Sequence, residues 1–270
     1  MIIFSERING MYRDVRGAIK ERNKEVIQNL VKEQAAGGAD VFDINIGPVK
    51  GDALEHFLWL AKAVNEVSDK PISLDSAKAA LLSQVIPAVR EALPDTKLVV
   101  NSCTAAPEYM EKLLPPTAAA GAGLICLTMD QDGVPGNVEK RIECGATVLM
   151  GALEAGIPIE DLYLDPITLP VNAAFKQQGF VLEAIQQLSM IHDPSPHFII
   201  GLSNVSTKCL NNHLLNRTFL VMCLAAGLDT AIMDAADVDL VEAAVAAEVL
   251  LGKHLYSDEF VKAWRIQKGL

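Results

Sequence analysis

Residues 41–76 read VFDINIGPVKGDALEHFLWLAKAVNEVSDKPISLDS and contain one complete repeat of the fold. The stretch starts with the apolar run Val41–Ile44 and ends with a second such run at 71–74. Asp52 stands between them, where a helix N-cap is expected. The apolar residues that follow it at helical spacing are Leu54, Phe57, Leu58, Ala61 and Val64. The stretch therefore predicts a strand, a helix and a second strand, which is the unit of a parallel sheet.

The same alternation recurs along the chain and predicts its fold class. Apolar, β-rich runs begin between 26 and 39 residues apart, which is about the length of one strand–helix unit. They lie at 2–4, 41–44, 71–74, 97–100, 124–127, 162–164, 198–201 and 231–233. Eight such units over roughly 250 residues predict an α/β protein with a closed (β/α)8 TIM barrel. No segment resembles a linker, so we expect a single domain over residues 1–270.

The alternative fold is an open, doubly wound sheet of the Rossmann type. That fold usually carries GxGxxG after its first strand, whereas residues 5–14 here read SERINGMYRD. The barrel also accounts for the helical patterns between the runs. We expect one helix between Val15 and Ala36 that ends at Gly37-Gly38, and another whose first turn holds Pro107. Further helices are expected at about 138–155, 176–191, 214–226 and 238–252.

Composition excludes several classes of partner. The 270 residues hold 23 Lys and Arg against 34 Asp and Glu, giving a net charge of −11, and 5% are aromatic. Nucleic-acid binding needs concentrated cations and aromatic platforms, so we expect no nucleic-acid partner. Glu6 and Arg7 interrupt any signal peptide, and no apolar run is long enough to cross a membrane. Five scattered cysteines without metal-ligand spacing indicate reduced thiols, a cytoplasmic location and no metal site.

Polar residues follow the predicted strands, at the end of the barrel where TIM-barrel active sites lie. In chain order the residues there, all polar except Gly47, are Glu6, Arg7, Asn9, Asp43, Asn45, Gly47, Asp75, Ser76, Asn101, Ser102, Thr128, Asp130, Asp165, Ser203, Asn204, Asp234 and Asp237. The ring is rich in Asp and Asn and nearly lacks Lys and His. It therefore disfavours Schiff-base aldolases, zinc hydrolases and phosphate sites.

Carboxylates and carboxamides at these positions match a particular kind of ligand. A carboxylate accepts paired N–H donors, and an Asn amide both donates and accepts. A 2-amino-pyrimidinone edge, as in a pterin or guanine, fits this pattern. Any single Asp or Asn after a strand is about as often a helix cap or turn former. The coincidence of Asp75, Asn101, Asp165 and Asn204 at four strand ends favours a binding site.

At these same positions the chain resembles a known family. The shared motifs are SERING at 5–10, DINIGP at 43–48, LDS at 74–76, VNS at 100–102, LTM at 127–129, LYLDP at 162–166, GLSNVS at 201–206 and NRTFL at 216–220. Together they resemble the methyltetrahydrofolate:corrinoid methyltransferases. Those are pterin-binding barrels related to dihydropteroate synthase and to the folate domain of cobalamin-dependent methionine synthase. The resemblance runs from residue 2 to about 262.

The resemblance implies a homodimeric barrel that binds tetrahydrofolate or 5-methyltetrahydrofolate. Its methyl group would be exchanged with cobalamin carried by a separate corrinoid protein. Carried over by position, Asp75, Asn101 and Asp165 would bind the pterin and Asn204 would lie beside N5. Gly201 and Ser203 would shape the pocket, which Asp43 and Asn45 would line. Asn204 and Asp75 are the expected catalytic residues, with Asp75 or a nearby water as the proton source.

The departures from the family pattern and two other functions stay open at this point. Thr207 and Asn212 stand where family members have Gln and Arg, which affects the expected contacts to the glutamate tail or the corrinoid. One alternative is a dihydropteroate synthase-like enzyme, although DINIGPVKGD lacks that family's STRPG-like loop. The other is a non-catalytic folate-binding or docking module. The direction of methyl transfer depends on the partner and on metabolite levels.

Overall fold

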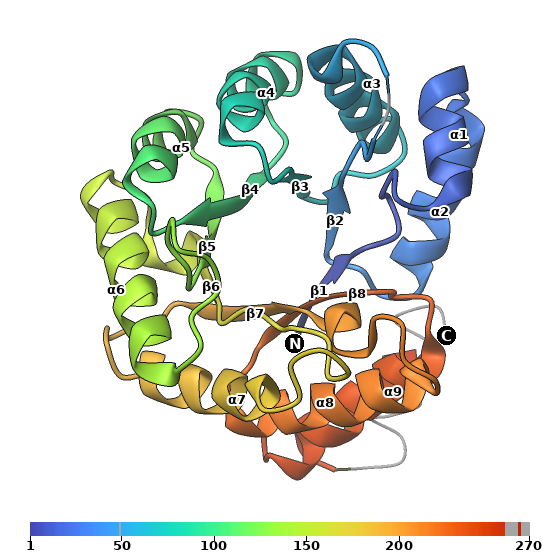
Figure 1. Cartoon of the computed structure of the whole chain (residues 1–270). Coiled ribbons are helices and arrows are strands. Elements are labelled where there is room, and N and C mark those ends of the chain that lie inside the picture. Colours follow the sequence, from blue (N-terminus) through green and yellow to red (C-terminus); the bar gives the residue numbers. More distant parts are fainter. Residues whose placement is uncertain (49, 257–263, 266–270) are drawn as a thin grey trace.

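The computed structural model describes residues 1–48, 50–256 and 264–265. It contains eight parallel strands: β1 (Ile2–Ser5), β2 (Val41–Ile44), β3 (Ile72–Asp75), β4 (Leu98–Thr104), β5 (Gly123–Leu127), β6 (Leu162–Asp165), β7 (His197–Gly201) and β8 (Thr230–Met233). They pair in sequence order, and β8 pairs with β1 to close the barrel (Figure 1). The predicted fold class and all eight predicted strands are confirmed.

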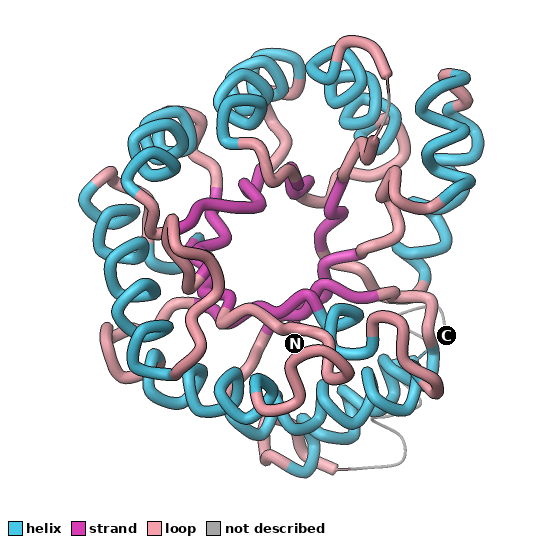
Figure 2. Tube along the Cα trace, viewed as in Figure 1, coloured by secondary structure: helices cyan, strands magenta, loops and turns pink. Residues whose placement is uncertain are grey.

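Helices form the outer layer and follow the strands in turn (Figure 2). They are α1 (Arg13–Glu21), α2 (Lys24–Ala36), α3 (Ala53–Asn65), α4 (Ala79–Ala92), α5 (Pro107–Ala119), α6 (Val138–Glu154), α7 (Gln177–Leu188), α8 (Asn212–Ala226) and α9 (Val238–Leu250). The four helices predicted after residue 130 agree within three residues at each end. The Asp52 carboxylate caps α3 by accepting from the backbone N–H groups of Leu54 and Glu55, as predicted.

Two parts of the helix prediction were wrong. The single helix expected over 15–36 is two helices, because Arg22 adopts a left-handed backbone with φ of 55° and ends α1. This position is usually glycine, so the sequence gives no signal for the break. Helix α4 was missed; its interior contains Pro87, a residue that normally counts against a helix.

The barrel interior is filled in two layers of different character. Deep in the barrel an apolar cluster packs, which includes Phe4, Val99, Ile125 and Ile199. Above it, at the carboxyl ends of the strands, the inward residues are polar. The larger apolar core lies between the strands and the helices. The interior is thus closed at one end by packed side chains and leaves a polar depression at the other.

The loops after β1 and β2 are held together by close backbone contact. Asn9 and Asn45 form an isolated parallel bridge beyond the two strands. A Cβ atom at Gly10 would lie 2.1 Å from the Ile46 carbonyl oxygen, and one at Gly47 would lie 2.4 Å from the Gly10 carbonyl carbon. Only glycine permits this approach, which extends the barrel wall and fixes Asn9 and Asn45 at its rim.

We expect Gly10→Ala to lower the free energy of unfolding by about 2–3 kcal/mol, because backbone must move to admit the methyl group. Gly17→Ala is the matched control. Gly17 lies inside α1 with no heavy atom within 4 Å of its added Cβ, so that change should raise stability by about 0.5–1 kcal/mol. Denaturant unfolding measures both. Equal midpoints for the two variants would contradict the close-contact interpretation.

Candidate active site

Polar residues from six strand ends converge on one cavity of about 320 Å³ at the carboxyl end of the barrel. Its lining consists of Glu6, Asn9, Asp43, Asp75, Asn101, Ser102, Leu127, Asp165, Ile167, Thr168, Gly201, Ser203, Asn204 and Ile232. Larger hollows exist on the surface, but they lie outside the barrel mouth. We assign the site to the smaller cavity because seven of the eight residues predicted for the site line it.

Strand β4 delivers two consecutive side chains to this cavity. In a regular strand, neighbouring residues point to opposite faces. The pairing of β4 with β5 shifts register between Asn101 and Cys103, which is a β-bulge. Bulges re-aim side chains next to functional sites, and both Asn101 and Ser102 line the pocket. The sequence placed Asn101 just after a strand, whereas β4 continues to Thr104.

Two carboxyl groups on neighbouring strands each meet an amide. The Asn101 amide donates to Asp43 at 3.1 Å, and the Asn45 amide donates to Asp75 at 2.7 Å. Asn45 also accepts from the backbone N–H of Gly47 at 2.7 Å, so its orientation is fixed. Asn45 does not line the cavity itself. It orients the Asp75 carboxyl group, which does.

Burial raises the pKa of both carboxyl groups, and the charge of Asp75 raises the pKa of Asp43 further. Two ionised carboxylates this close repel one another in a poorly hydrated site. The pair therefore favours retention of a proton on Asp43. At Asp75 the hydrogen bond from Asn45 opposes the rise in pKa that burial causes. Asp75 is the one suited to accept N–H groups from a ligand.

Asp165, at the end of β6, has the most isolated carboxyl group in the site. Its exposed fraction is 8%, and it accepts the backbone N–H of Ile167 at 2.7 Å. Burial raises its pKa to about 7, against the lowering effects of the Ile167 N–H and the charge of Arg141. Near neutral pH this carboxyl group is partly protonated and gains from a ligand that brings N–H donors.

A fully buried arginine shapes the loop beside Asp165. The Arg141 guanidinium, on α6, donates to the carbonyl oxygens of Pro166 and Ile167 and to the Gln177 side chain. Ile167 has a positive φ of 64° and lines the pocket together with Thr168. The Thr168 hydroxyl is buried without a hydrogen-bond partner among the described residues. Sequence reasoning missed both residues, because neither follows a strand directly.

The opposite wall comes from β7 and the loop after β1. An added Cβ at Gly201 would lie 2.7 Å from the Asn204 amide nitrogen, so glycine lets Asn204 fold over the strand end. The Ser203 hydroxyl bonds the Glu6 carboxylate, with distances of 2.8 and 2.9 Å to its two oxygens. Burial raises the pKa of Glu6 to about 6, although the Ser203 hydroxyl opposes this; the Asp234 charge adds to the rise.

Other members of the sequence-predicted ring have structural partners. Asp237 caps α9, and Asp130 pairs with Lys140. Asp234 accepts from the Gln34 side chain at 2.6 Å. All five cysteines are unpaired, and only Cys209 is not buried. Of the described residues, no His, Cys, Asp and Glu are grouped in threes that would hold a metal ion.

The cavity therefore offers acceptors and amides but no positive charge. Its described lining contains four carboxyl groups and no Lys, Arg or His. Such a site suits an uncharged heterocycle with several N–H donors, and it does not suit a phosphorylated ligand. In the described part of the chain, we also find no helix long and apolar enough to span a bilayer.

Comparison with known proteins agrees with this chemistry. The family described as "Pterin binding enzyme" matches residues 13–234. The chain is 28% identical to the methylcorrinoid:tetrahydrofolate methyltransferase of Eubacterium limosum, over 98% of this chain and 96% of that protein. It is also 28% identical to the methionine synthase of Mycobacterium leprae, over 88% of this chain but 20% of that longer protein.

Solved structures with the same fold include dihydropteroate synthases. One from Yersinia pestis, bound to a pterine-sulfa conjugate, has a TM-score of 0.65 at 16% identity, covering 93% of this chain and 94% of that one. One from Coxiella burnetii, bound to pteroic acid, has a TM-score of 0.66 at 14% identity, covering 94% of each chain. At this identity the likeness shows the fold. The family match spans most of the chain, and the protein therefore belongs to the pterin-binding enzymes.

Proposed function

We propose that this protein moves a methyl group between N5 of tetrahydrofolate and the cobalt of a separate corrinoid protein. The observation that carries the proposal is the cavity at the carboxyl end of the barrel, whose lining suits an uncharged ligand and includes Asp75, Asn101, Asp165 and Asn204. The end-to-end match with the methylcorrinoid:tetrahydrofolate methyltransferase of E. limosum supports it, because the two chains have nearly the same extent.

In this proposal the pterin is held by its hydrogen-bonding edge. The Asp165 carboxylate accepts the paired N–H groups of the 2-amino-pyrimidinone. Asp75, oriented by Asn45, and Asn101, oriented by Asp43, complete the set from the neighbouring strands. Each of these side chains is already fixed by a protein partner, so little ordering is required on binding.

The reaction needs orientation and charge stabilisation rather than a protein nucleophile. Reduced cobalamin on the partner is itself a strong nucleophile. The difficult requirement is that N5 of the folate gain a proton or a hydrogen bond as its methyl group leaves. We assign this to Asn204, whose exposed side chain lies over β7 at the pocket wall. A hydrogen bond that strengthens as charge develops lowers the barrier.

The proton source is a carboxyl group in the same cavity. Asp75 is the residue that the sequence suggested, and the structure adds Glu6, which is joined to Ser203 next to Asn204 in the chain. With its pKa at about 6, Glu6 is a stronger candidate than an ordinary surface glutamate, because a useful part of it is protonated near neutral pH.

Further elements of the proposal concern assembly and pathway. We propose a cytoplasmic homodimer that meets its corrinoid protein in trans over the barrel mouth. Thr207 and Asn212, where family members carry Gln and Arg, lie exposed on the loop after β7 and at the start of α8. The direction of transfer follows the pathway: from methylcorrinoid to tetrahydrofolate in a demethylating system, or the reverse in acetyl-CoA synthesis.

Dihydropteroate synthesis is disfavoured by the cavity lining. That reaction uses a pterin diphosphate, and a diphosphate needs cations or a helix N-terminus turned toward it. The described residues that line the cavity supply no cation. A non-catalytic folate-binding role would need the same pterin clamp but no turnover, so the methyl-transfer assay separates it from the proposed function.

The assay uses the full chain with 5-methyltetrahydrofolate and reduced cobalamin, followed by the cobalamin absorbance change. We expect catalysed loss of the reduced form, and the surface variant Asp69→Asn should match the wild type. Folate binding without turnover, with free and with protein-bound cobalamin, would indicate a binding module. Turnover of pterin diphosphate and p-aminobenzoate would instead identify a dihydropteroate synthase.

A further inference from the structure

Arg141 is a buried cation that lies next to the candidate site without lining it. It stands near the start of α6, its exposed fraction is 0%, and it is not among the residues that border the cavity. A buried guanidinium usually faces a carboxylate, because an unpaired charge is costly to remove from water. In the described part of the chain, however, every acceptor that the Arg141 guanidinium reaches is uncharged.

The acceptors of Arg141 show what this side chain holds. Two of them are the carbonyl oxygens of Pro166 and Ile167, the second at 3.0 Å, in the loop that follows β6. The others are the Pro135 carbonyl oxygen, at 3.4 Å, and the Gln177 side chain at the start of α7. Arg141 thus joins the first turns of α6 and α7 to the two residues that follow β6.

The segment that Arg141 holds has a backbone conformation that needs support. Ile167 has a φ of 64°, and a β-branched residue is unfavourable in the left-handed region. Two contacts keep it there, because its N–H donates to the Asp165 carboxyl group at 2.7 Å and its carbonyl oxygen accepts from Arg141. Without Arg141 we expect Ile167 to relax toward a negative φ, which would move Ile167 and Thr168 away from the cavity wall.

The chain on either side of this segment is held by other partners. Before it, the Asp165 carbonyl oxygen accepts the backbone N–H of Thr128 at 3.0 Å, which ties the end of β6 to β5. After it, the Leu169 carbonyl oxygen accepts from the Gln178 side chain at 2.8 Å. We therefore expect the effect of Arg141 to be confined to the three residues between these two anchors.

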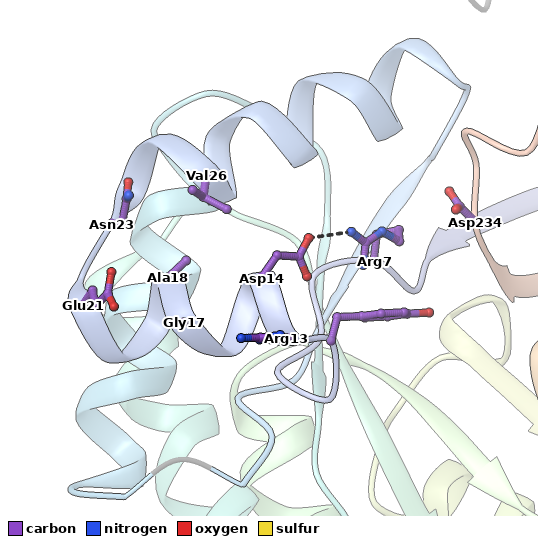
Figure 3. A pocket seen from close by; sticks show the side chains of 10 residues that line it. Arg7, Arg13, Asp14, Gly17, Ala18, Glu21, Asn23, Val26 and Asp234 are labelled. Carbon is purple, nitrogen blue, oxygen red and sulfur yellow. Dashed lines mark hydrogen bonds and ion pairs between the residues drawn. The ribbon is translucent and has the colours of Figure 1, made fainter.

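Arg141 also supplies the positive charge that acts on Asp165. Burial raises the pKa of Asp165 to about 7, and the Arg141 charge opposes that rise. The Cys223 thiol on α8 is close as well, but burial raises its pKa, so it is uncharged near neutral pH. Arg7, in the loop after β1, is instead balanced by an ion pair with Asp14 at 2.9 Å (Figure 3). Ionisation of Asp165 on ligand binding therefore places a negative charge near the buried guanidinium.

We propose that Arg141 is a positioning residue of the folate site, which holds residues 166–168 so that Asp165 and Thr168 stay at the cavity wall. This inference rests on the proposed function for its ligand, because the pterin is the ligand assigned to that cavity. The effect of Arg141 on the loop does not depend on a ligand, so the two can be tested separately.

The first measurement uses the full chain without ligand. Amide hydrogen exchange of Ile167, followed by NMR, reports its contact with Asp165. We expect exchange at least about tenfold faster in Arg141→Met than in the wild type, because the loop opens more often. Arg90→Met is the matched control. Arg90 also binds backbone carbonyl oxygens, but in the loops before β4 and β5, at the opposite end of the barrel, so this variant should leave the Ile167 exchange unchanged.

The second measurement is calorimetric titration with tetrahydrofolate. Arg141→Met should weaken binding by at least about tenfold, because the clamp is displaced. The kcat for methyl transfer at saturating folate should change less than about threefold, since Asn204 and Glu6 lie on the opposite wall. A merely structural role would not produce this division. Arg90→Met should keep both the wild-type affinity and the wild-type kcat.

The pH dependence of the affinity separates the charge of Arg141 from its hydrogen bonds. In Arg141→Met the pH at which the affinity levels off should move above the wild-type value of about 7, because the charge that opposes the rise in the Asp165 pKa is gone. Arg141→Lys should keep that pH near the wild-type value. It should recover only part of the affinity, because an ammonium group lacks the planar fork that reaches several acceptors.

Gln177→Leu is a milder variant for the case in which Arg141→Met does not fold. It removes one acceptor of the guanidinium and should change exchange and affinity in the same direction, by smaller factors. Wild-type exchange and affinity in Arg141→Met, or in Gln177→Leu if the first does not fold, overturn the proposal. An equal loss of affinity in Arg90→Met also overturns it. If the wild type does not bind tetrahydrofolate, the proposed function is wrong, and the exchange of Ile167 still shows whether Arg141 holds the loop.

Discussion

Asp165→Asn is expected to weaken tetrahydrofolate binding by at least about 100-fold. Hydrogen bonds to a charged group contribute about 1.5–3 kcal/mol each, and the carboxylate is assigned two of them. An asparagine keeps the acceptor for the Ile167 N–H, but it turns an N–H₂ group toward the donors of the pterin. The variant thus loses an attraction and gains a repulsion, and calorimetric titration measures the sum.

The same carboxyl group gives the wild-type affinity a defined pH dependence. With a pKa of about 7 before the ligand binds, Asp165 must lose its proton to accept the pterin N–H groups. We expect the affinity to rise with pH up to about 7 and to level off above it, by at most tenfold per pH unit. In Asp165→Asn this dependence should disappear. An affinity constant between pH 6 and pH 8 in the wild type would contradict the assignment of Asp165 to the pterin.

Asp165→Asn should have the opposite effect on stability. The pKa is raised from 3.8 to about 7 in the folded protein, so the folded state holds this proton more tightly than the unfolded state does. The stabilisation by the protonated form is complete below pH 4 and is lost as pH rises to about 7. Relative to the wild type, the variant should gain roughly 3 kcal/mol between pH 5 and pH 8. Asp69→Asn, an exposed carboxyl change, should show no such gain.

The barrel could be predicted from the sequence because its strands are buried on both faces. Runs such as residues 124–127 are continuously apolar when both faces of the strand are covered, and that signal does not depend on distant contacts. The split between α1 and α2 does depend on them. Arg22 takes a left-handed conformation without being glycine or asparagine, and its guanidinium bonds Glu55 on α3. Helix α4 was hidden by Pro87, whose missing N–H is tolerated because the residue is exposed.

The candidate site was predictable where a side chain follows a strand directly. Asp75 and Asp165 are the last residues of β3 and β6, and Asn204 lies three residues beyond the end of β7, so the barrel topology brings all three to the same end. The loop residues Ile167 and Thr168 enter the site because Arg141, far along the chain, binds the loop carbonyls from within the core. No pattern in the sequence around Ile167 and Thr168 indicates that contact. The elevated pKa values likewise arise from burial and from neighbours such as Asp43 and Asp75, which only the folded chain brings together.

Asn204→Ala is expected to lower kcat for methyl transfer by about 100-fold while changing the KM for the folate less than about threefold. Removal of one preorganised hydrogen-bonding group from a site of developing charge typically costs 10²–10³ in rate. Asn204 is exposed at the pocket wall, and Asp75, Asn101 and Asp165 remain in place. The loss should therefore appear in the chemical step and leave the pterin clamp intact.

The division between kcat and KM is what distinguishes catalysis from binding at Asn204. A residue that held ground and transition states equally would raise KM and leave kcat unchanged. Asn29→Ala, a substitution at an exposed position on α2, is the control and should keep the wild-type kcat and KM. Single-turnover mixing of bound 5-methyltetrahydrofolate with reduced cobalamin isolates the transfer step. If Asn204→Ala transfers the methyl group at the wild-type rate, then N5 receives its hydrogen bond elsewhere, and Glu6→Gln becomes the decisive variant. Glu6 would then be the group that acts on N5. It lies on the same wall of the cavity as Asn204, because it is hydrogen-bonded to Ser203, the residue before Asn204.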